Sequence, residues 1–328
     1  MIFQLIVPQY NENEEVLRNL LDSVALQQNV NFNDIGVVII NDGNPNSYLS
    51  TKFLRSYPFK IDYIKSKHLG VSAARNTGLD HATADYVMFC DADDMFFNAC
   101  GLYIVFNQIA KGGFETFVSC FLEETRNPES KEIVYVQHDA DSTFVHGKIH
   151  NRKFLIDNKI RWNEKLTIHE DSYFNCLCQK IASPEKAIYC PSAFYLWKWR
   201  DNSVCRHDPK YILKTFNNML DSNTELVNEF IKRNRASDAQ FHSVAMIYES
   251  YFTMNKPEWI NQENKEYREA TEKRFTEYYK KFKFLFDAID EKIKAQIIMT
   301  IKNRMFQEGL LLESITFDDW IKHILETY

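Results

Sequence analysis

The sequence predicts an α/β protein whose first part is a doubly wound, mostly parallel sheet and whose remainder is helical. Short apolar runs alternate with amphipathic stretches up to about residue 120, polar clusters follow the apolar runs, and long amphipathic patterns take over after about residue 208. Apolar runs rich in β-branched and aromatic residues are typical of strands buried on both faces of a parallel sheet. Such strands alternating with helices indicate a doubly wound sheet, whose ligand site lies at the carboxyl ends of its strands.

Each expected element rests on a short stretch of sequence. The expected strands of the parallel sheet are residues 3–7, 35–40, 61–64 and 86–90. The expected helices between them, which carry one apolar stripe, are residues 14–27 and 71–79. Two further strands are expected at 116–123 and 132–137, joined by a polar loop. The polar clusters that follow the first, second and fourth strands are residues 8–11, 41–43 and 91–94.

The length of 328 residues fits two domains. We expect residues 1–207 to form the α/β domain that carries the ligand site, and residues 208–328 to form a helical C-terminal domain or appendage, with a helix break at Pro257. Because an amphipathic helix must bury its apolar stripe, these helices should pack on the first domain or on a second copy of the chain, which would make a homo-oligomer.

Composition disfavours several classes of protein. The net charge of −6 gives no global basic field that would draw the chain to nucleic acid or anionic lipid, although a local basic groove stays open. No apolar run approaches the ~20 residues of a membrane helix, and the N-terminus carries no basic leader. The seven cysteines are an odd number without a Cys-x-x-Cys pair, which indicates reduced thiols. We therefore expect a cytoplasmic protein, either free or peripheral at the inner face of the membrane.

An acidic tetrapeptide, Asp91-Ala92-Asp93-Asp94, follows the fourth expected strand. Carboxylates two residues apart at the end of an apolar strand cannot both point into the core, because burial of an unpaired carboxylate is costly. Hard oxygen ligands on such a turn suit Mg²⁺ or Mn²⁺, with a phosphate-bearing substrate completing the coordination shell. The alternative is a solvated acidic turn or a helix N-cap.

The segment 70–78 precedes the fourth strand and opens an expected helix. Gly70 and Ser72 allow a helix start whose backbone N–H groups and dipole face the carboxyl edge of the sheet, where a diphosphate is favoured. Arg75 adds a planar cation that can grip phosphate or a base edge, and Asn76 adds an amide. The alternative is an ordinary capped helix with a surface arginine.

Asp42 ends the second expected strand and leaves two readings open. Its carboxylate can accept a hydrogen bond from a nucleobase imide N–H, or it can cap the turn at Gly43. Other nucleotide-using α/β proteins are disfavoured, because no G-x-G-x-x-G follows the first strand and no G-x-x-x-x-G-K-[ST] occurs. The Gly-rich N-terminal signature of a sugar-nucleotide pyrophosphorylase is also absent from the sequence.

Taken together, these motifs resemble the inverting family 2 glycosyltransferases, which have the GT-A fold. The six pieces stand in family order: Val7-Pro8-x-Tyr10-Asn11 with Glu12, Asn41-Asp42-Gly43, Ser72-x-Ala74-Arg75-Asn76-x-Gly78, Asp91-x-Asp93-Asp94, Glu170-Asp171, and Arg200-x-x-Ser203. The resemblance covers roughly residues 1–205 and does not extend to the helical C-terminus. It implies metal-dependent transfer of a sugar from a nucleotide diphosphate donor to an acceptor hydroxyl, with inversion of the anomeric centre. Residues 1–207 would then be the nucleotide-sugar-binding and catalytic domain.

The resemblance also implies a role for each motif. The donor nucleotide would be bound by Pro8, Tyr10, Asn11, Glu12, Asp42, Arg75, Asn76, Asp91, Ala92 and Arg200. Asp93, with Asp91 and His207, would hold Mn²⁺ or Mg²⁺, which neutralises the charge of the departing nucleotide. Asp171 would be the general base that takes the proton of the acceptor hydroxyl; an acidic helix N-cap is its alternative role.

Three assignments keep their alternatives. Aromatic residues in 195–200 could stack on sugar rings while the cations hold diphosphate, or the segment could be a half-buried strand with snorkelling cations. His207, which falls where some enzymes of the GT-A fold supply a third metal ligand, could instead be a lone surface histidine. In 145–148, which resembles the turn before the acceptor helix of the family, His146 stands where an aromatic is more usual.

The expected activity is that of a hexosyl- or N-acetylhexosaminyl-transferase with a glycan or glycoconjugate acceptor, acting in cell-surface polysaccharide synthesis. UDP is the preferred nucleotide because it is the commonest in the family. Two alternatives stay open. One is an enzyme that glycosylates modified DNA bases, which the acidic balance disfavours. The other is a catalytically inactive sugar-binding or scaffold relative, against which the intact Asp93 and Asp171 argue.

Overall fold

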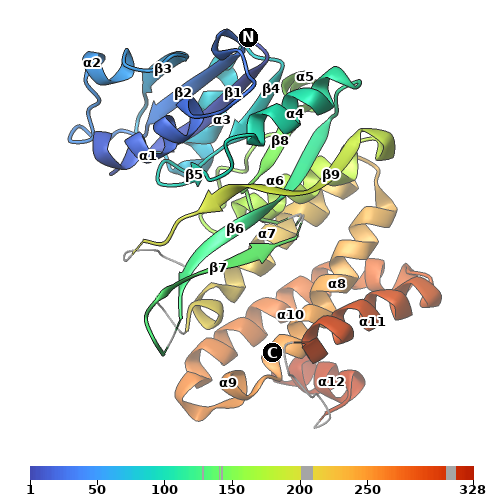
Figure 1. Cartoon of the computed structure of the whole chain (residues 1–328). Helices are drawn as coiled ribbons and strands as arrows, with labels where there is room; N and C mark the ends of the chain where they lie inside the picture. Colours follow the sequence, from blue (N-terminus) through green and yellow to red (C-terminus); the bar gives the residue numbers. More distant parts are fainter. Residues whose placement is uncertain (128, 140, 142, 201–209, 308–314) are drawn as a thin grey trace. The chain divides into compact units, whose positions relative to one another are not determined.

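The computed structural model describes residues 1–127, 129–139, 141, 143–200, 210–307 and 315–328. The chain divides into two compact units, Met1–Ser203 and Val204–Tyr328. The first unit contains a sheet flanked by helices and the second is helical, so the predicted α/β class with a helical C-terminal part is confirmed (Figure 1).

The described strands of the first unit form one nine-stranded sheet. They are β1 (Phe3–Gln9), β2 (Ile35–Asn41), β3 (Lys60–Lys65), β4 (Tyr86–Phe89), β5 (Met95–Phe96), β6 (Thr116–Arg126), β7 (Ile133–His138), β8 (Lys148–Asn151) and β9 (Ala187–Trp197). Their order is β3-β2-β1-β4-β8-β6-β9-β5, and β7 pairs with β6. The strands from β3 to β4 are parallel, whereas β8 runs antiparallel to both β4 and β6.

All six predicted strands are present, but one is less buried than expected. The runs at 3–7, 35–40, 86–90, 116–123 and 132–137 correspond to β1, β2, β4, β6 and β7. The run at 61–64 lies in β3, whose residues are half-buried or exposed because β3 is at the edge of the sheet. The sequence did not predict β8 or the full length of β9, which carries Pro191 where its register against β6 shifts.

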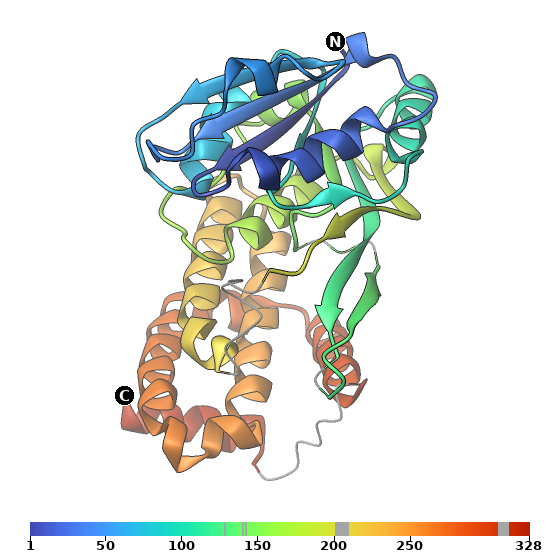
Figure 2. The ribbon, with the colours of Figure 1, turned by 60° about the vertical axis from the view of Figure 1, so that its left-hand side comes forward.

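Helices cover both faces of the parallel half of the sheet. Helix α1 (Glu14–Ala25), capped by Asn13, buries Leu17, Leu20, Leu21 and Val24 in the main core, and helix α3 (Val71–His81) lies on the opposite face. Successive residues of β2 point to opposite faces of the sheet: Val37 lies in the main core, and Val38 packs with Ala74 of α3. Each fully buried leucine contributes about 1.5–3 kcal/mol. Figure 2 shows α1, in dark blue, lying along the sheet.

Two glycines set the position of α3. A Cβ on Gly78 would collide with Ile6, so glycine is needed where α3 crosses β1. Gly70, the residue before the helix, has φ 93°, a conformation that favours glycine. This turn brings Arg75, in the second turn of α3, beside the residues that follow β4.

The remaining elements of the first unit are short. They are helices α2 (Thr51–Leu54), α4 (Gly101–Ala110), α5 (Arg152–Asp157) and α6 (Glu170–Ile181), and the 3₁₀ turns Phe32–Asp34 and Pro184–Lys186. Helix α6 matters most for the site, because it starts with Glu170 and Asp171.

The second unit is a bundle built around α8. Its helices are α7 (Tyr211–Lys232), α8 (Ala236–Met254), α9 (Pro257–Ile260), α10 (Lys265–Ala288), α11 (Glu291–Gln307) and α12 (Phe317–Thr327), with a 3₁₀ turn at Gln262–Asn264. Helix α8 packs against α7, α10 and α11. Aromatic side chains contact one another inside the bundle, as Phe216 does with Trp259 and Tyr248 with Phe317. Among the described helices, none has the length and apolar character needed to cross a membrane.

Candidate active site

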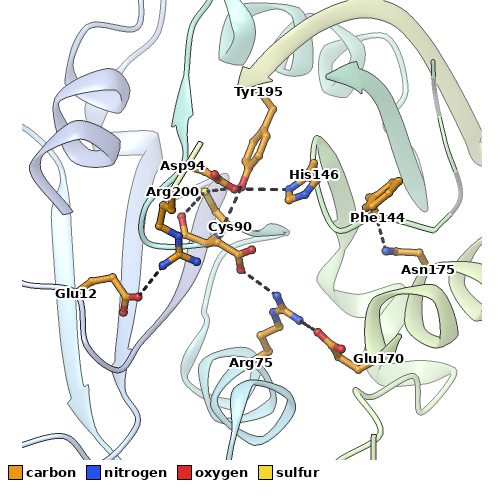
Figure 3. Close-up of polar contacts among 11 residues, drawn as sticks. Glu12, Arg75, Cys90, Asp94, Phe144, His146, Glu170, Asn175, Tyr195 and Arg200 are labelled. Carbon is orange, nitrogen blue, oxygen red and sulfur yellow. Dashed lines mark hydrogen bonds and ion pairs between the residues drawn. The ribbon is translucent and has the colours of Figure 1, made fainter. Parts of the chain in front are cut away.

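The carboxyl ends of β1, β2 and β4 meet at one edge of the sheet, and charged side chains from distant segments gather there. Figure 3 shows Arg200 lying between Glu12 and the acidic turn after β4, and Arg75 lying between that turn and Glu170. The structure therefore brings the first, third, fourth and fifth predicted motifs, and Arg200 of the sixth, together at one site.

Residues in and just after β9 anchor the buried side of the acidic turn. Asp94 is fully buried; its Oδ2 accepts a hydrogen bond from the Tyr195 hydroxyl at 2.5 Å and its Oδ1 accepts one from the Lys198 N–H at 3.0 Å. Burial, Asp93 and Asp91 raise the pKa of Asp94 well above its usual range. Because Asp94 faces inward, Asp91 is left about one third exposed at the edge of the site.

Asp93 is paired with Arg200, a contact that the sequence analysis did not predict. The Arg200 Nε forms an ion pair with Asp93, and its second nitrogen lies 3.4 Å from the Glu12 carboxylate. Burial and the neighbouring Asp91 raise the pKa of Asp93 to about 6, while Arg200 opposes that rise. A carboxylate in this position is stabilised by any cation that approaches it.

Two of the three predicted metal ligands lie in this turn. They are Asp91 and Asp93; the third, His207, lies outside the described residues. In the part of the chain that the structure describes, ligand atoms of Asp91, Asp94 and His146 lie within 4.8 Å of one another. Carboxylate oxygens are the hard ligands that Mg²⁺ and Mn²⁺ prefer, so the donor set of the turn fits either ion.

His146 was not predicted as part of this site. Its ring stacks on Tyr195 and Trp197, with centroids 5.2 and 4.8 Å apart, and its Nδ1 lies 3.6 Å from the Asp94 carboxylate. The loop that carries it is tied to α6, because the Asn175 amide donates to the carbonyl of Phe144 at 2.9 Å. The one sequence signal for His146 was that it stands where the family usually has an aromatic residue. In the structure its imidazole ring packs against aromatic rings, as an aromatic residue would.

Arg75 connects the acidic turn to α6. Its side chain is 3% exposed, and its two terminal nitrogens lie 3.0 Å from Asp91 Oδ1 and 3.0 Å from Glu170 Oε1. The guanidinium lies over the ring of Trp162, 4.3 Å from its centroid. Burial opposes ionisation of Asp91, but Arg75 and the other nearby cations outweigh it and lower the pKa of Asp91 below its ordinary value.

Asp171 lies in the first turn of α6. The residue before the helix, His169, has a left-handed backbone with φ 62°, which is uncommon for a residue other than glycine. Asp171 Oδ1 accepts a hydrogen bond from the Ser172 N–H at 2.8 Å. Burial and the adjacent Glu170 raise the pKa of Asp171 to about 7, against the lowering effect of Arg75 and Lys148. A carboxylate with that pKa is poised to exchange a proton near neutral pH.

Asp42 holds the loop that leads into α3. Its carboxylate is buried and accepts hydrogen bonds from the N–H groups of Leu69 and Gly70, both at 3.0 Å, and contacts His68 Nδ1 at 3.0 Å. Its capping partners are therefore in the loop before α3, and not in the Asp42-Gly43 turn. Neither motif spacing nor periodicity pointed to His68, which stacks on the exposed ring of Tyr10 at 4.3 Å.

The other predicted nucleotide-binding residues lie around this edge in different environments. Glu12 Oε2 accepts from the Tyr10 and Asn11 N–H groups, and the Asn11 amide oxygen accepts from Asn44. The Asn76 amide donates both hydrogens to the loop of residues 162–164, and its oxygen accepts from the Trp162 N–H. Pro8 lies within β1, and Ala92 is buried in the acidic turn.

Comparison with known proteins gives a family match over the same region. A model of the family described as "Glycosyl transferase family 2" matches residues 4–172, just over half of the chain. The chain is 29% identical to the glycosyltransferase GlyA of Streptococcus pneumoniae serotype 4 over 227 residues, which cover 62% of this chain and 31% of GlyA. It is 31% identical to the minor teichoic acid biosynthesis protein GgaB of Bacillus subtilis over 127 residues, which cover 38% of this chain and 12% of GgaB. The chain thus spans less than a third of the length of these two relatives.

A similar fold is found in a crystal structure of S. aureus TarS 1-349. The TM-score is 0.61 at 16% sequence identity, covering 95% of this chain and 93% of that one. The same TarS fragment has been solved in complex with UDP and with UDP-GlcNAc, at TM-scores of 0.58 and 0.59. At this identity the likeness shows the fold alone, including the helical C-terminal part.

Proposed function

The chain belongs to glycosyl transferase family 2 and is a glycosyltransferase, and we propose that it moves a hexosyl or N-acetylhexosaminyl group from a UDP-sugar to a hydroxyl of a cell-surface polysaccharide or glycoconjugate. The observation that carries the proposal is the meeting, at one edge of the sheet, of the acidic turn, Arg75 and the Glu170–Asp171 helix start. Such a transfer needs a site for the diphosphate, which the acidic turn and Arg75 would supply, and a base for the acceptor hydroxyl, which the helix start would supply.

The choice of donor and acceptor is supported by the relatives. TarS 1-349, which shares the fold, has been crystallised with UDP and with UDP-GlcNAc. GgaB, which is similar over part of its length, is named for minor teichoic acid biosynthesis. In this chain, the stacked rings of Tyr10 and His68 beside Asp42 offer an aromatic surface and a carboxylate for a nucleobase.

Asp93 and Asp91 would hold a divalent ion at the acidic turn. Asp93 already attracts one cation, the Arg200 guanidinium, and the mutual repulsion of the two carboxylates would be relieved by an ion between them. When bound, Mg²⁺ or Mn²⁺ would supply Lewis-acid stabilisation of the negative charge that develops on the diphosphate. Arg200 and Arg75 add fixed positive charge around the same group.

Asp171 would act as the general base. Its carboxylate would take the proton of the acceptor hydroxyl while that oxygen bonds to the anomeric carbon, and the bond from that carbon to the diphosphate oxygen would break on the opposite face. The electron pair of the broken bond leaves with the nucleotide diphosphate, so the anomeric centre is inverted. General-base catalysis of this kind is typically worth about 10²–10⁴-fold in rate.

Release of UDP tests the proposal. The purified chain should release UDP from UDP-GlcNAc or UDP-glucose slowly by hydrolysis, faster in the presence of Mn²⁺, and fastest with an added glycan acceptor. The Asp171→Asn variant should keep UDP binding by calorimetry and lose the release. No release and no binding of either UDP-sugar, with or without Mn²⁺, would remove the proposed donor class.

A further inference from the structure

We propose that Arg75 and Glu170 are positioning residues of the transfer reaction, because their buried ion pair fixes the Asp171 carboxylate relative to the acidic turn. This inference rests on the proposed function, because it assigns the residues that hold the general base of that reaction in position. Arg75 bridges Asp91, in the turn after β4, and Glu170, at the start of α6.

The bridge depends on the shape of the guanidinium. Its two terminal nitrogens each contact a different carboxylate at 3.0 Å, and the two partners are contributed by elements that lie far apart in the sequence. A planar fork with several fixed donors can hold two carboxylates in one geometry, whereas a lysine ammonium is a single point charge on a flexible stem. The side chains of Arg75 and Glu170 are 3% and 13% exposed, so solvent screens their pair little.

The same two elements are already joined by an apolar contact. Trp162 stacks on Phe174 of α6 with centroids 4.2 Å apart, and Phe89 of β4 meets both rings at 5.0 and 5.4 Å. Since this aromatic cluster already holds α6 against β4, cohesion does not require the ion pair. The ion pair of Arg75 and Glu170 instead fixes the orientation of the first turn of α6, and with it the position of the Asp171 carboxylate.

The pair also controls the charge around Asp171. Three charged groups in the described residues act on Asp171: Glu170 beside it, Arg75 from α3 and Lys148 from β8. Asp171 in turn raises the pKa of Cys176 in the next turn of α6. Glu170 raises the pKa of Asp171, while Arg75 and Lys148 lower it. Loss of Glu170 or of Arg75 should therefore move the ionisation of the base in opposite directions.

The test compares two charge-removing variants, Glu170→Gln and Arg75→Gln, by the pH dependence of kcat for UDP release from UDP-GlcNAc. In wild type, the acidic limb of the pH profile is the range in which kcat decreases because Asp171 becomes protonated. This limb should lie near pH 7. Glu170→Gln should move this limb to lower pH and Arg75→Gln to higher pH, each by about one unit. Limbs that do not move, or that move in the same direction, would overturn the proposal.

A second measurement keeps the positioning claim separate from catalysis. Hydrogen exchange of the amides of residues 170–174 should be faster in Glu170→Gln than in wild type, because the first turn of α6 loses its anchor. The matched control is Asp80→Asn, which removes an exposed ion pair between α3 and Arg161. Exchange that is equal in Glu170→Gln and in the control would overturn the positioning role even if no sugar transfer is detected. If Arg75→Gln does not fold, Glu170→Gln decides both measurements.

Discussion

Tyr195 and Asp94 are 101 residues apart in the sequence, and the Tyr195 hydroxyl donates a 2.5 Å hydrogen bond to the buried Asp94 carboxylate. The contact joins β9, the last described strand along the chain, to the turn after β4. It orients the whole acidic tetrapeptide, since a carboxylate anchored behind the turn leaves Asp91 and Asp93 facing the site.

Tyr195→Phe should destabilise the first unit. The variant leaves Asp94 Oδ2 without its shortest hydrogen-bond donor in a fully buried position, and an unsatisfied buried group costs about 1–3 kcal/mol. Urea unfolding measures the change in free energy. Tyr189→Phe is the control, because Tyr189 is on the same strand but exposed, with its hydroxyl bonded to Gln179. Equal stability of the two variants would mean that Asp94 does not depend on Tyr195.

Asp93→Asn should abolish the effect of metal on turnover and leave the fold intact. The substitution keeps the shape of the side chain but removes the charge that a divalent ion requires, and the Lewis-acid contribution of such an ion is several kcal/mol. We expect at least ~100-fold loss of UDP release at saturating Mn²⁺. Circular dichroism checks the fold.

Asp62→Asn is the control for that experiment, because Asp62 pairs with Lys60 at the exposed edge strand β3. Its activity should equal wild type. Full activity of Asp93→Asn, or full activity of wild type in excess EDTA, would show that no metal takes part.

Asp171→Asn should lower kcat by about 10²–10⁴-fold with little change in UDP affinity, because the amide cannot accept the proton of the acceptor. In wild type, kcat should fall as the pH drops through about 7, since burial and Glu170 raise the pKa of Asp171 to about 7 and only the ionised form is a base. Steady-state kinetics from pH 5 to 9 and calorimetry with UDP provide the two readouts.

Glu170→Gln is the comparison variant for the general base. It should lose less turnover than Asp171→Asn, because adjacent side chains at a helix start diverge by about 100° and only one faces the acceptor. If the order of severity were reversed, the base would be Glu170; wild-type turnover in both variants would place the base elsewhere.

Asp42→Ala should both loosen the loop before α3 and weaken nucleotide binding. The carboxylate accepts hydrogen bonds from Leu69 and Gly70, so its loss leaves two backbone N–H groups without their acceptor. If Asp42 also pairs with a base imide N–H, UDP should lose more affinity than CDP, which lacks that group. Calorimetry with both nucleotides separates the two roles, and equal losses would reduce Asp42 to a loop anchor.

The family and the parallel half of the sheet followed from local sequence. The apolar runs of β1, β2 and β4 are buried on both faces, and a short run of that kind has few other stable environments. The motifs at the ends of these strands identified the glycosyltransferase family, and the family match over residues 4–172 confirms it. Those features depend on neighbours in sequence, which is why the sequence sufficed for them.

The pairing of the site residues was decided only by the tertiary structure. Arg75 was expected at a base or a phosphate, and it contacts Glu170, 95 residues further along the chain. Tyr195 reaches Asp94 because β5, which directly follows Asp94, pairs with β9, and His146 reaches it because β8, which follows His146, pairs with β4. Strand order and register arise from the packing of the whole sheet, since a shift of one residue turns a side chain to the other face. The sequence by itself determined the strands and the polar motifs that follow β1, β2 and β4, and only the packed sheet determined which side chains touch there and that His146 and Tyr195 join them.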